Sequence, residues 1–200
     1  LLVGIGGVGS FCFETLIRCG VENITVIDFD TYEESNLNRQ LYATIDTLGK
    51  KKIDTALARA KSINENVNIN VLDTFLDFNS DFDFSSYDYI IDACDSVPAK
   101  ANLILNAKKY NKKIIVSLGI GNRVCPELVC KSTLKENLSD PLGKKLNHYL
   151  IKKCDFNENV NVICSKEKPI KSQPISSYVC TTSVAGIYLS DYVIKDIING

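Results

Sequence analysis

Several absences in the 200-residue sequence narrow its class. The longest apolar stretch, residues 184–198, is interrupted by Asp191, Lys195 and Asp196, so no segment offers the ~20 apolar residues of a membrane span. The eight cysteines include no Cys-x-x-Cys pair, which argues against structural zinc. The only histidine, His148, has no candidate acid or nucleophile beside it, which argues against a catalytic dyad. No secretory signal opens the chain, so we expect a soluble, cytoplasmic protein with reduced thiols.

The overall composition is that of a globular domain. With 45% hydrophobic and 24% charged residues, the chain can bury a core, and we treat residues 1–200 as one domain. Residues 1–100 carry 8 Lys and Arg against 16 Asp and Glu, whereas residues 101–200 carry 15 against 8. The net charge of −1 is therefore the sum of an acidic first half and a basic second half. The basic half either meets an anionic partner or uses its lysines for solubility alone.

Strand and helix patterns alternate along the first part of the chain. We expect strands at residues 1–5, 24–28, 67–72, 87–92 and 114–116, and helices after the glycine turn up to residue 20, at 50–63 and at 98–110. This alternation predicts an α/β fold with a doubly wound, mainly parallel Rossmann-like sheet.

Beyond residue 121 the pattern becomes irregular. We expect an extended run at 124–131, a helix near 140–153, a polar stretch at 155–177 and a last helix from Thr182. Residues 1–121 would form the nucleotide-binding core. Residues 122–200 would be a C-terminal extension that provides the substrate side and a dimer contact.

A Gly-x-Gly-x-x-Gly motif formed by Gly4, Gly6 and Gly9 closes the first strand and opens the first helix. Glycines let the backbone approach phosphates closely, and the helix start offers free N–H groups. Asp28, at the end of the second strand, is placed to bind ribose hydroxyls. This context predicts a nucleotide site, the alternative being a tight turn without a ligand.

Three charged residues favour a triphosphate over a dinucleotide, because ATP needs side-chain cations in addition to a helix start. Arg39 lies in a polar loop that Asn36 or Asn38 could fix, and Lys52 begins the next helix. Asp95 follows the fourth strand, where it could hold a metal near the phosphates. Each alone is typical of a surface charge, so the argument lies in their joint placement at strand ends.

Four motifs in this order resemble the ubiquitin-activating-like (ThiF/MoeB-type) adenylyltransferase family over residues 1–121. They are the glycine motif, Asp28-Phe29-Asp30, Ser35-Asn36-Leu37-Asn38-Arg39-Gln40 and Asp92-Ala93-Cys94-Asp95. The resemblance implies adenylation of a carboxylate with ATP and Mg²⁺. It assigns ribose binding to Asp28, phosphate contacts to Asn36, Arg39 and Lys52, and metal or adenylation chemistry to Asp95.

Further motifs resemble one branch of that family, the tRNA threonylcarbamoyladenosine dehydratases. They are residues 95–100, the loop 119–123, and residues 139–142 followed by a basic helix. The resemblance implies activation of the threonyl carboxylate beside the tRNA anticodon, followed by ring closure with loss of water. It also implies a homodimer in which an arginine upstream of Leu1 enters the partner's ATP site, so we expect the chain to be a fragment. A sulfur-relay protein stays open as a further partner.

The basic helix of the second half is the expected tRNA contact. Lys144, His148 and Lys152 recur at i, i+4 and i+8, and Lys145 widens the stripe. This spacing places the cations on one helical face, where they could bind the phosphates of the anticodon arm. The alternative is a solvated basic face without a partner.

Two other functions fit parts of the sequence. An adenylyltransferase for the C-terminus of a ubiquitin-like or sulfur-carrier protein would need a nucleophilic cysteine if it forms a thioester, and Cys164 and Cys154 are the candidates, although an inert thiol is the more common state of each. A regulatory module that binds a dinucleotide would use the glycine motif and Asp28 alone. Pyrophosphate exchange from ATP separates that module from both enzymes.

Overall fold

All seven strands of the protein belong to one sheet in the computed structural model, which describes residues 1–200. The strands are β1 (Leu2–Val3), β2 (Asn23–Ile27), β3 (Asn68–Leu72), β4 (Tyr89–Asp92), β5 (Lys113–Ser117), β6 (Val129–Thr133) and β7 (Asn161–Ser165). Their order is β3-β2-β1-β4-β5-β7-β6, and only β6 and β7 pair antiparallel. The chain thus winds outward from β1 to β3 and then crosses to β4 on the other side, which confirms the predicted doubly wound sheet.

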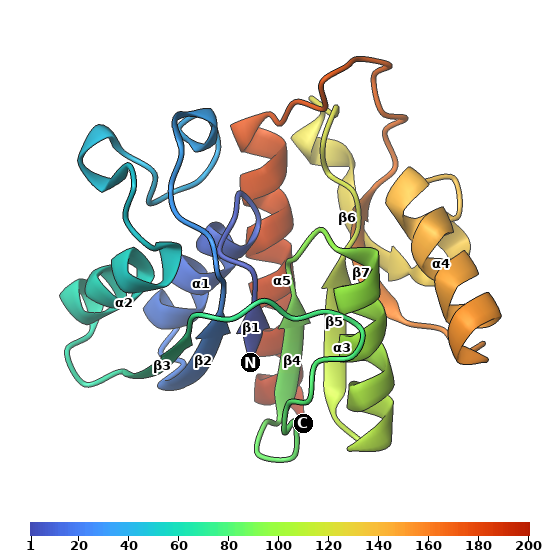
Figure 1. The fold of residues 1–200 in the computed structure, drawn as a ribbon, viewed down its shortest axis with the longest axis horizontal. Helices are drawn as coiled ribbons and strands as arrows, with labels where there is room; N and C mark the ends of the chain where they lie inside the picture. Colours follow the sequence, from blue (N-terminus) through green and yellow to red (C-terminus); the bar gives the residue numbers. More distant parts are fainter.

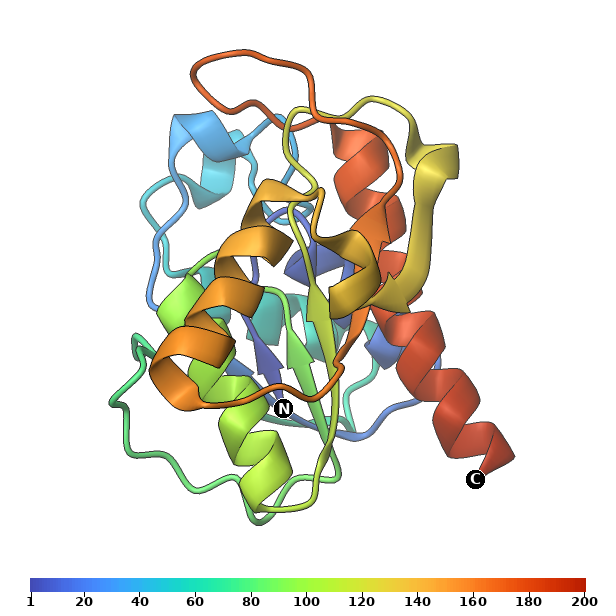
Figure 2. The same cartoon turned by 90° about the vertical axis from the view of Figure 1, so that its right-hand side faces the viewer.

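Five helices cover the two faces of the sheet. They are α1 (Gly9–Arg18), α2 (Lys52–Ile63), α3 (Val97–Lys109), α4 (Pro141–Cys154) and α5 (Val179–Asn199). One core joins α1, α2 and α5, and a second joins α3 and α4. Figures 1 and 2 show how these helices lie around the sheet in two views at right angles. None of the five combines the length and hydropathy needed to cross a bilayer.

Side-chain caps fix the starts of two helices near the carboxyl edge of the sheet. Ser96 caps α3 by accepting a hydrogen bond from the Ala99 N–H, and Asp140 caps α4 by accepting one from the Gly143 N–H at 2.7 Å. Each helix carries a proline in its first turn, where a missing N–H costs nothing. The two helix starts are therefore defined by local sequence.

The predicted boundaries of the C-terminal extension were wrong in three places. The polar stretch 155–177 contains β7, whose last four residues are buried between β5 and β6. Polar residues flank this short apolar run and hid it. The extended run 124–131 divides into a 3₁₀ turn at Pro126–Leu128 and β6. The last helix begins at Val179 rather than Thr182.

Candidate functional site

A cavity of about 1250 Å³ opens at the carboxyl ends of the central strands. Gly6 lines it after β1, Asp28 after β2, Asp95 after β4 and Gly119 after β5. Open α/β sheets bind ligands at this edge, where the strand order reverses. The cavity therefore unites most of the predicted site residues.

Gly4, Gly6 and Gly7 of the glycine turn line the cavity, and the backbone is most open at Gly6. Gly6 lines the cavity, and a Cβ added there would lie 4.0 Å from its nearest neighbour, the Gln40 side chain. No side chain caps the first turn of α1, so its N–H groups other than that of Ser10, which donates to the Gly6 carbonyl, can receive an anion. Gly4 adopts φ +93°, and a Cβ on Gly9 would overlap the Gly4 carbonyl oxygen. Gly9 thus lets α1 pack against the turn and does not itself line the cavity.

Asp28 ties the glycine turn to β2. Its Oδ2 accepts a hydrogen bond from the Ile5 N–H at 2.7 Å, and its Oδ1 accepts one from the Asp30 N–H at 2.9 Å. A carboxylate has about four lone-pair sites, so each oxygen can accept one more hydrogen bond. Asp28 lines the cavity and can therefore receive ribose hydroxyls without giving up either backbone contact.

Arg39 carries the unpaired cation of the polar loop. Its Nη1 donates hydrogen bonds to the Ser35 carbonyl at 2.6 Å and to Asn38 Oδ1 at 3.0 Å, and it contacts no carboxylate. Asn36 is buried and accepts the Glu33 N–H, which fixes the turn below Arg39. Asn38 also donates to the Ser177 carbonyl at 3.3 Å, so both asparagines hold this loop.

Lys52 differs from the free cation expected at this position. Its side chain is 6% exposed, and its Nζ lies 2.7 Å from Asp30 Oδ2. Both residues line the cavity. A phosphate contact would therefore have to share Lys52 with Asp30, and Arg39 is the stronger candidate for binding phosphate.

Asp95 is exposed at the cavity wall and makes no hydrogen bond or ion pair. No group of three or more His, Cys, Asp or Glu side chains is arranged to hold a metal. Mg²⁺ is commonly bound by one or two carboxylates together with substrate phosphates rather than by a cage of protein ligands. Asp95 fits that mode because its carboxylate is unpaired and accessible.

The sequence analysis did not predict a buried ion pair that lies beneath the cavity. Lys100 and Asp92 are fully buried, with Lys100 Nζ 3.1 Å from each Asp92 carboxylate oxygen and 2.8 Å from the Ser117 carbonyl. The pair ties the ends of β4 and β5 to α3. Burial and the adjacent Asp92 raise the pKa of the Cys94 thiol, which therefore stays protonated. The position of Lys100 within the apolar run of α3 was the available signal.

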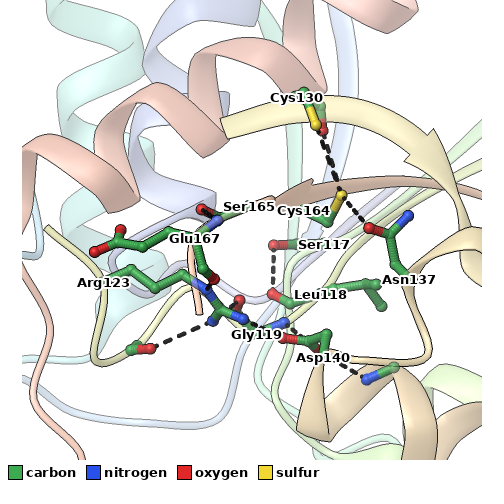
Figure 3. Close-up of polar contacts among 12 residues, drawn as sticks. Ser117, Leu118, Gly119, Arg123, Cys130, Asn137, Asp140, Cys164, Ser165 and Glu167 are labelled. Carbon is green, nitrogen blue, oxygen red and sulfur yellow. Dashed lines mark hydrogen bonds and ion pairs between the residues drawn. The ribbon is translucent and has the colours of Figure 1, made fainter. Parts of the chain in front are cut away.

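Arg123 organises the opposite wall, as Figure 3 shows. Its Nη2 lies 2.6 Å from Asp140 Oδ2, and both side chains are almost fully buried. The Arg123 guanidinium also donates hydrogen bonds to the carbonyls of Gly119 and Glu167. The Thr181 hydroxyl donates a hydrogen bond to the backbone carbonyl of Arg123. One residue thus joins the loop after β5, the start of α4, the segment after β7 and α5. Sequence reasoning found Arg123 only as part of a motif.

The basic residues of α4 lie together near the cavity. Lys144, Lys145, His148 and Lys152 are exposed, and no ion pair includes them. Lys145 alone among them lines the cavity. The helix can therefore present positive charge at the cavity rim and on its outer surface.

The two candidate nucleophilic cysteines lie away from the cavity. Cys164 is buried, and its Sγ lies 3.9 Å from Cys130 Sγ and donates to Asn137 Oδ1 at 3.2 Å (Figure 3). Burial and the neighbouring Cys130 raise the pKa of Cys164 to about 12. Burial also raises the pKa of Cys154. Both thiols are therefore held in the protonated form, which disfavours a thioester-forming enzyme.

Comparison with known proteins identifies relatives over nearly the whole chain. A model of the ThiF family matches residues 1–198. The chain is 36% identical to the tRNA threonylcarbamoyladenosine dehydratase of Haemophilus influenzae, covering 87% of this chain and 67% of that protein. It is 31% identical to the Bacillus subtilis protein of the same name, covering 98% and 85%.

Solved structures of the Escherichia coli tRNA N6-threonylcarbamoyladenosine dehydratase, TcdA, share the fold. The complex with AMP superposes with a TM-score of 0.95 at 30% identity, covering 99% of this chain and 85% of that one. The complex with ATP gives a TM-score of 0.91 at 28% identity, covering 99% and 84%. The likeness includes both the sheet and the extension beyond residue 121.

Proposed function

The chain belongs to the ThiF family, and from this premise we propose that it catalyses the ATP-dependent dehydration of threonylcarbamoyladenosine in tRNA. One observation carries the proposal. A single cavity combines an open glycine turn, a ribose-binding carboxylate and an unpaired arginine with the start of a basic helix. Relatives with this activity cover most of the chain and support the assignment.

The proposed reaction has two steps. A threonyl carboxylate oxygen attacks the α-phosphorus of ATP, the bond to the β-phosphate bridge breaks, and pyrophosphate leaves. The neighbouring ureido group then attacks the activated carbonyl, loses a proton and expels AMP with the former carboxylate oxygen. The substrate thereby loses the elements of water, and ATP becomes AMP and pyrophosphate.

The protein's part is alignment and charge neutralisation rather than proton transfer. Gly6 and the start of α1 receive the phosphates, Asp28 the ribose, and Arg39 the charge that develops on the leaving pyrophosphate. Asn36 holds the Arg39 loop, and Lys52 pairs with Asp30 at the cavity wall. Asp95 is the residue that would hold Mg²⁺, which supplies charge neutralisation at the phosphates when bound.

The tRNA would lie across the outer surface of α4. Lys144, His148 and Lys152 can contact phosphates of the anticodon arm without reading sequence. The modified base would then enter the cavity, where recognition takes place. The exposed, unpaired state of these side chains supports this orientation.

A homodimer is part of the proposal. The outer side of α5 leaves Ile187, Tyr188, Ile197 and Ile198 exposed, and these can pack against a second copy. Sedimentation at micromolar concentration should give a dimer. A monomer with full activity would contradict this part of the proposal.

Mass spectrometry of nucleosides tests the reaction directly. Bulk tRNA carrying threonylcarbamoyladenosine is incubated with the full-length protein and ATP, and the modified nucleoside should lose one water with release of AMP and pyrophosphate. Unchanged tRNA would overturn the proposal. Pyrophosphate release that depends instead on a ubiquitin-like or sulfur-carrier protein would establish the other adenylyltransferase function.

A further inference from the structure

The cavity has two ends that differ in chemistry. The end at the glycine turn carries the residues assigned above to ATP. The other end is lined by the loop after β5, the start of α4 and residues 169–177, which cross above the strand ends in Figures 1 and 2. The volume of about 1250 Å³ exceeds the ~300–1,000 Å³ of a typical small-molecule site. A second molecule can therefore occupy this other end beside the nucleotide.

The charged side chains of this second end favour an anion. Arg123, Asp140, Lys145 and Lys171 are the charged residues that line it. Arg123 and Asp140 neutralise each other in their buried pair. Lys145 and Lys171 make no ion pair and donate no side-chain hydrogen bond. The loop after β5, residues 118–125, and residues 169–177 contain no carboxylate. Two uncompensated cations thus face this end of the cavity.

Of these two cations, Lys145 has the better defined backbone. It lies in the second turn of α4, whose start is held by the Asp140 cap and the Arg123 pair. The next residue, Leu146, is fully buried in the core between α3 and α4. Lys171 lies in an exposed segment without helix or strand. A reacting group needs a fixed partner because small errors in alignment are costly to rate.

From this placement we infer that Lys145 binds the substrate carboxylate and orients it toward the nucleotide. Lys144, His148 and Lys152 do not line the cavity and contact only tRNA phosphates. This inference rests on the proposed function and divides the basic helix into two roles. Lys145 recognises the carboxylate of the modified nucleoside, whereas Lys144, His148 and Lys152 contribute affinity for any tRNA.

Binding of two tRNAs tests this division. One carries threonylcarbamoyladenosine, and the other is the same tRNA with unmodified adenosine, which lacks the carboxylate. The wild-type protein should prefer the modified tRNA by about tenfold, a typical contribution of a hydrogen bond to a charged group. Lys145→Ala should reduce this preference to less than about twofold, and Lys145→Arg should restore part of it.

Lys144→Ala is the matched control, since it removes the same charge from the adjacent exposed position. It should weaken both tRNAs equally and lower the salt dependence of binding, while the preference between them stays at the wild-type value. Lys112→Ala, at the opposite edge of the sheet, controls for net charge. Neither variant removes a buried contact, so both should fold.

Three results separate the inference from the proposed function. If Lys145→Ala keeps the wild-type preference, or if Lys171→Ala loses it instead, the inference is wrong while the dehydratase function stands. If the wild-type protein neither prefers the modified tRNA nor consumes ATP with it, the proposed function itself fails. If Lys145→Ala is the only variant that loses the preference for the modified tRNA, the result supports both the inference and the proposed function.

Discussion

The two ends of the cavity are built by different means. The phosphate-binding backbone of the nucleotide end comes from contiguous residues, because the glycine turn and the start of α1 lie within residues 4–9, and single side chains after β2 and β4 complete this end. The substrate end joins segments that lie far apart in the sequence. Arg123 connects four of them, and Asn122 holds residues 169–177 through paired hydrogen bonds with the Ser176 backbone at 2.7 and 2.8 Å.

This difference predicts how each end fails. At the nucleotide end, an exposed side chain such as Asp95 can be removed with little effect on packing. At the substrate end, removing the buried Arg123 leaves Asp140 without its charge partner and releases several segments together. We therefore expect the two ends to be separable by mutation, and the following tests run from the largest expected effect to the smallest.

Asp95→Asn should cause the largest loss of activity. The change removes the only unpaired carboxylate after β4 but keeps its shape, and ATP–pyrophosphate exchange should fall by about 100-fold or more, as for other preorganised electrostatic groups. The melting temperature should stay at the wild-type value because Asp95 makes no internal contact. Undiminished exchange would remove Asp95 from the mechanism.

Arg123→Gln should separate the two ends of the cavity. Breaking one partner of a buried ion pair costs on the order of 3–5 kcal/mol, so the melting temperature should fall. Below that temperature, dehydration of tRNA should fall by about tenfold, while ATP affinity changes less than about threefold, because coupling decays with distance. Dehydration rates measured over a range of tRNA concentrations and ATP affinity measured by titration, on the same protein preparation, give the two effects.

Lys100→Met is the matched control for Arg123→Gln, since it breaks the other buried pair and should cause a comparable loss of stability. It should weaken ATP binding, because Lys100 holds the ends of β4 and β5 below the nucleotide. Equal loss of ATP affinity in both variants would show that the two ends are not independent.

The sequence placed the residues expected at the nucleotide end around one cavity because their signals are local. The glycine motif, Asp28 and Arg39 each follow a strand with clear apolar periodicity, and strand ends meet at one edge of a parallel sheet. The pattern therefore indicated both the fold and the position of the cavity. It could not indicate that Gly9 serves helix packing or that Lys52 pairs with Asp30, since both depend on distances between elements.

The substrate end was predicted only in part. The Asp140-Pro141 signal correctly placed the start of α4, because a capping residue and a first-turn proline are local features. β7 was missed, because a short central strand is recognised by burial on both faces rather than by length. The role of Arg123 depends on carbonyls as distant in sequence as that of Glu167. No pattern within a sequence window carries that information.

Charge reversal on the outer surface of α4 tests whether the helix that borders the substrate end of the cavity also determines the affinity for tRNA. Lys144→Glu with Lys152→Glu should weaken tRNA binding by more than about tenfold. The slope of log affinity against log salt should become shallower by about 0.7–0.9 for each tRNA phosphate that the protein no longer neutralises. ATP affinity should stay unchanged. Filter binding at several salt concentrations measures the slope, and an unchanged slope would exclude this helix face as the tRNA surface.

The smallest expected effect compares one buried thiol from each of the two hydrophobic cores. Burial raises the pKa of Cys12 in α1 well above its ordinary value, and burial and Cys130 raise the pKa of Cys164 in β7 to about 12. In the unfolded chain a thiol ionises near pH ~8.5, so above that pH the unfolded state releases protons that the folded state retains. Stability should therefore fall as pH rises, by at most about 1.4 kcal/mol per pH unit for each thiol.

The difference in melting temperature between each variant and the wild type between about pH 8 and 9.5 isolates its thiol, because the α-amino group and the tyrosines that also titrate near this range are common to both proteins. Cys12→Ala and Cys164→Ala should each lower stability at every pH by opening a small cavity, but should flatten its decline with pH. Cys19→Ala, at an exposed position, should leave the decline as in the wild type. If Cys12→Ala flattens the curve and Cys164→Ala does not, the β7 thiol has solvent access, and the core between β7, α3 and α4 is less tightly closed than the core around α1.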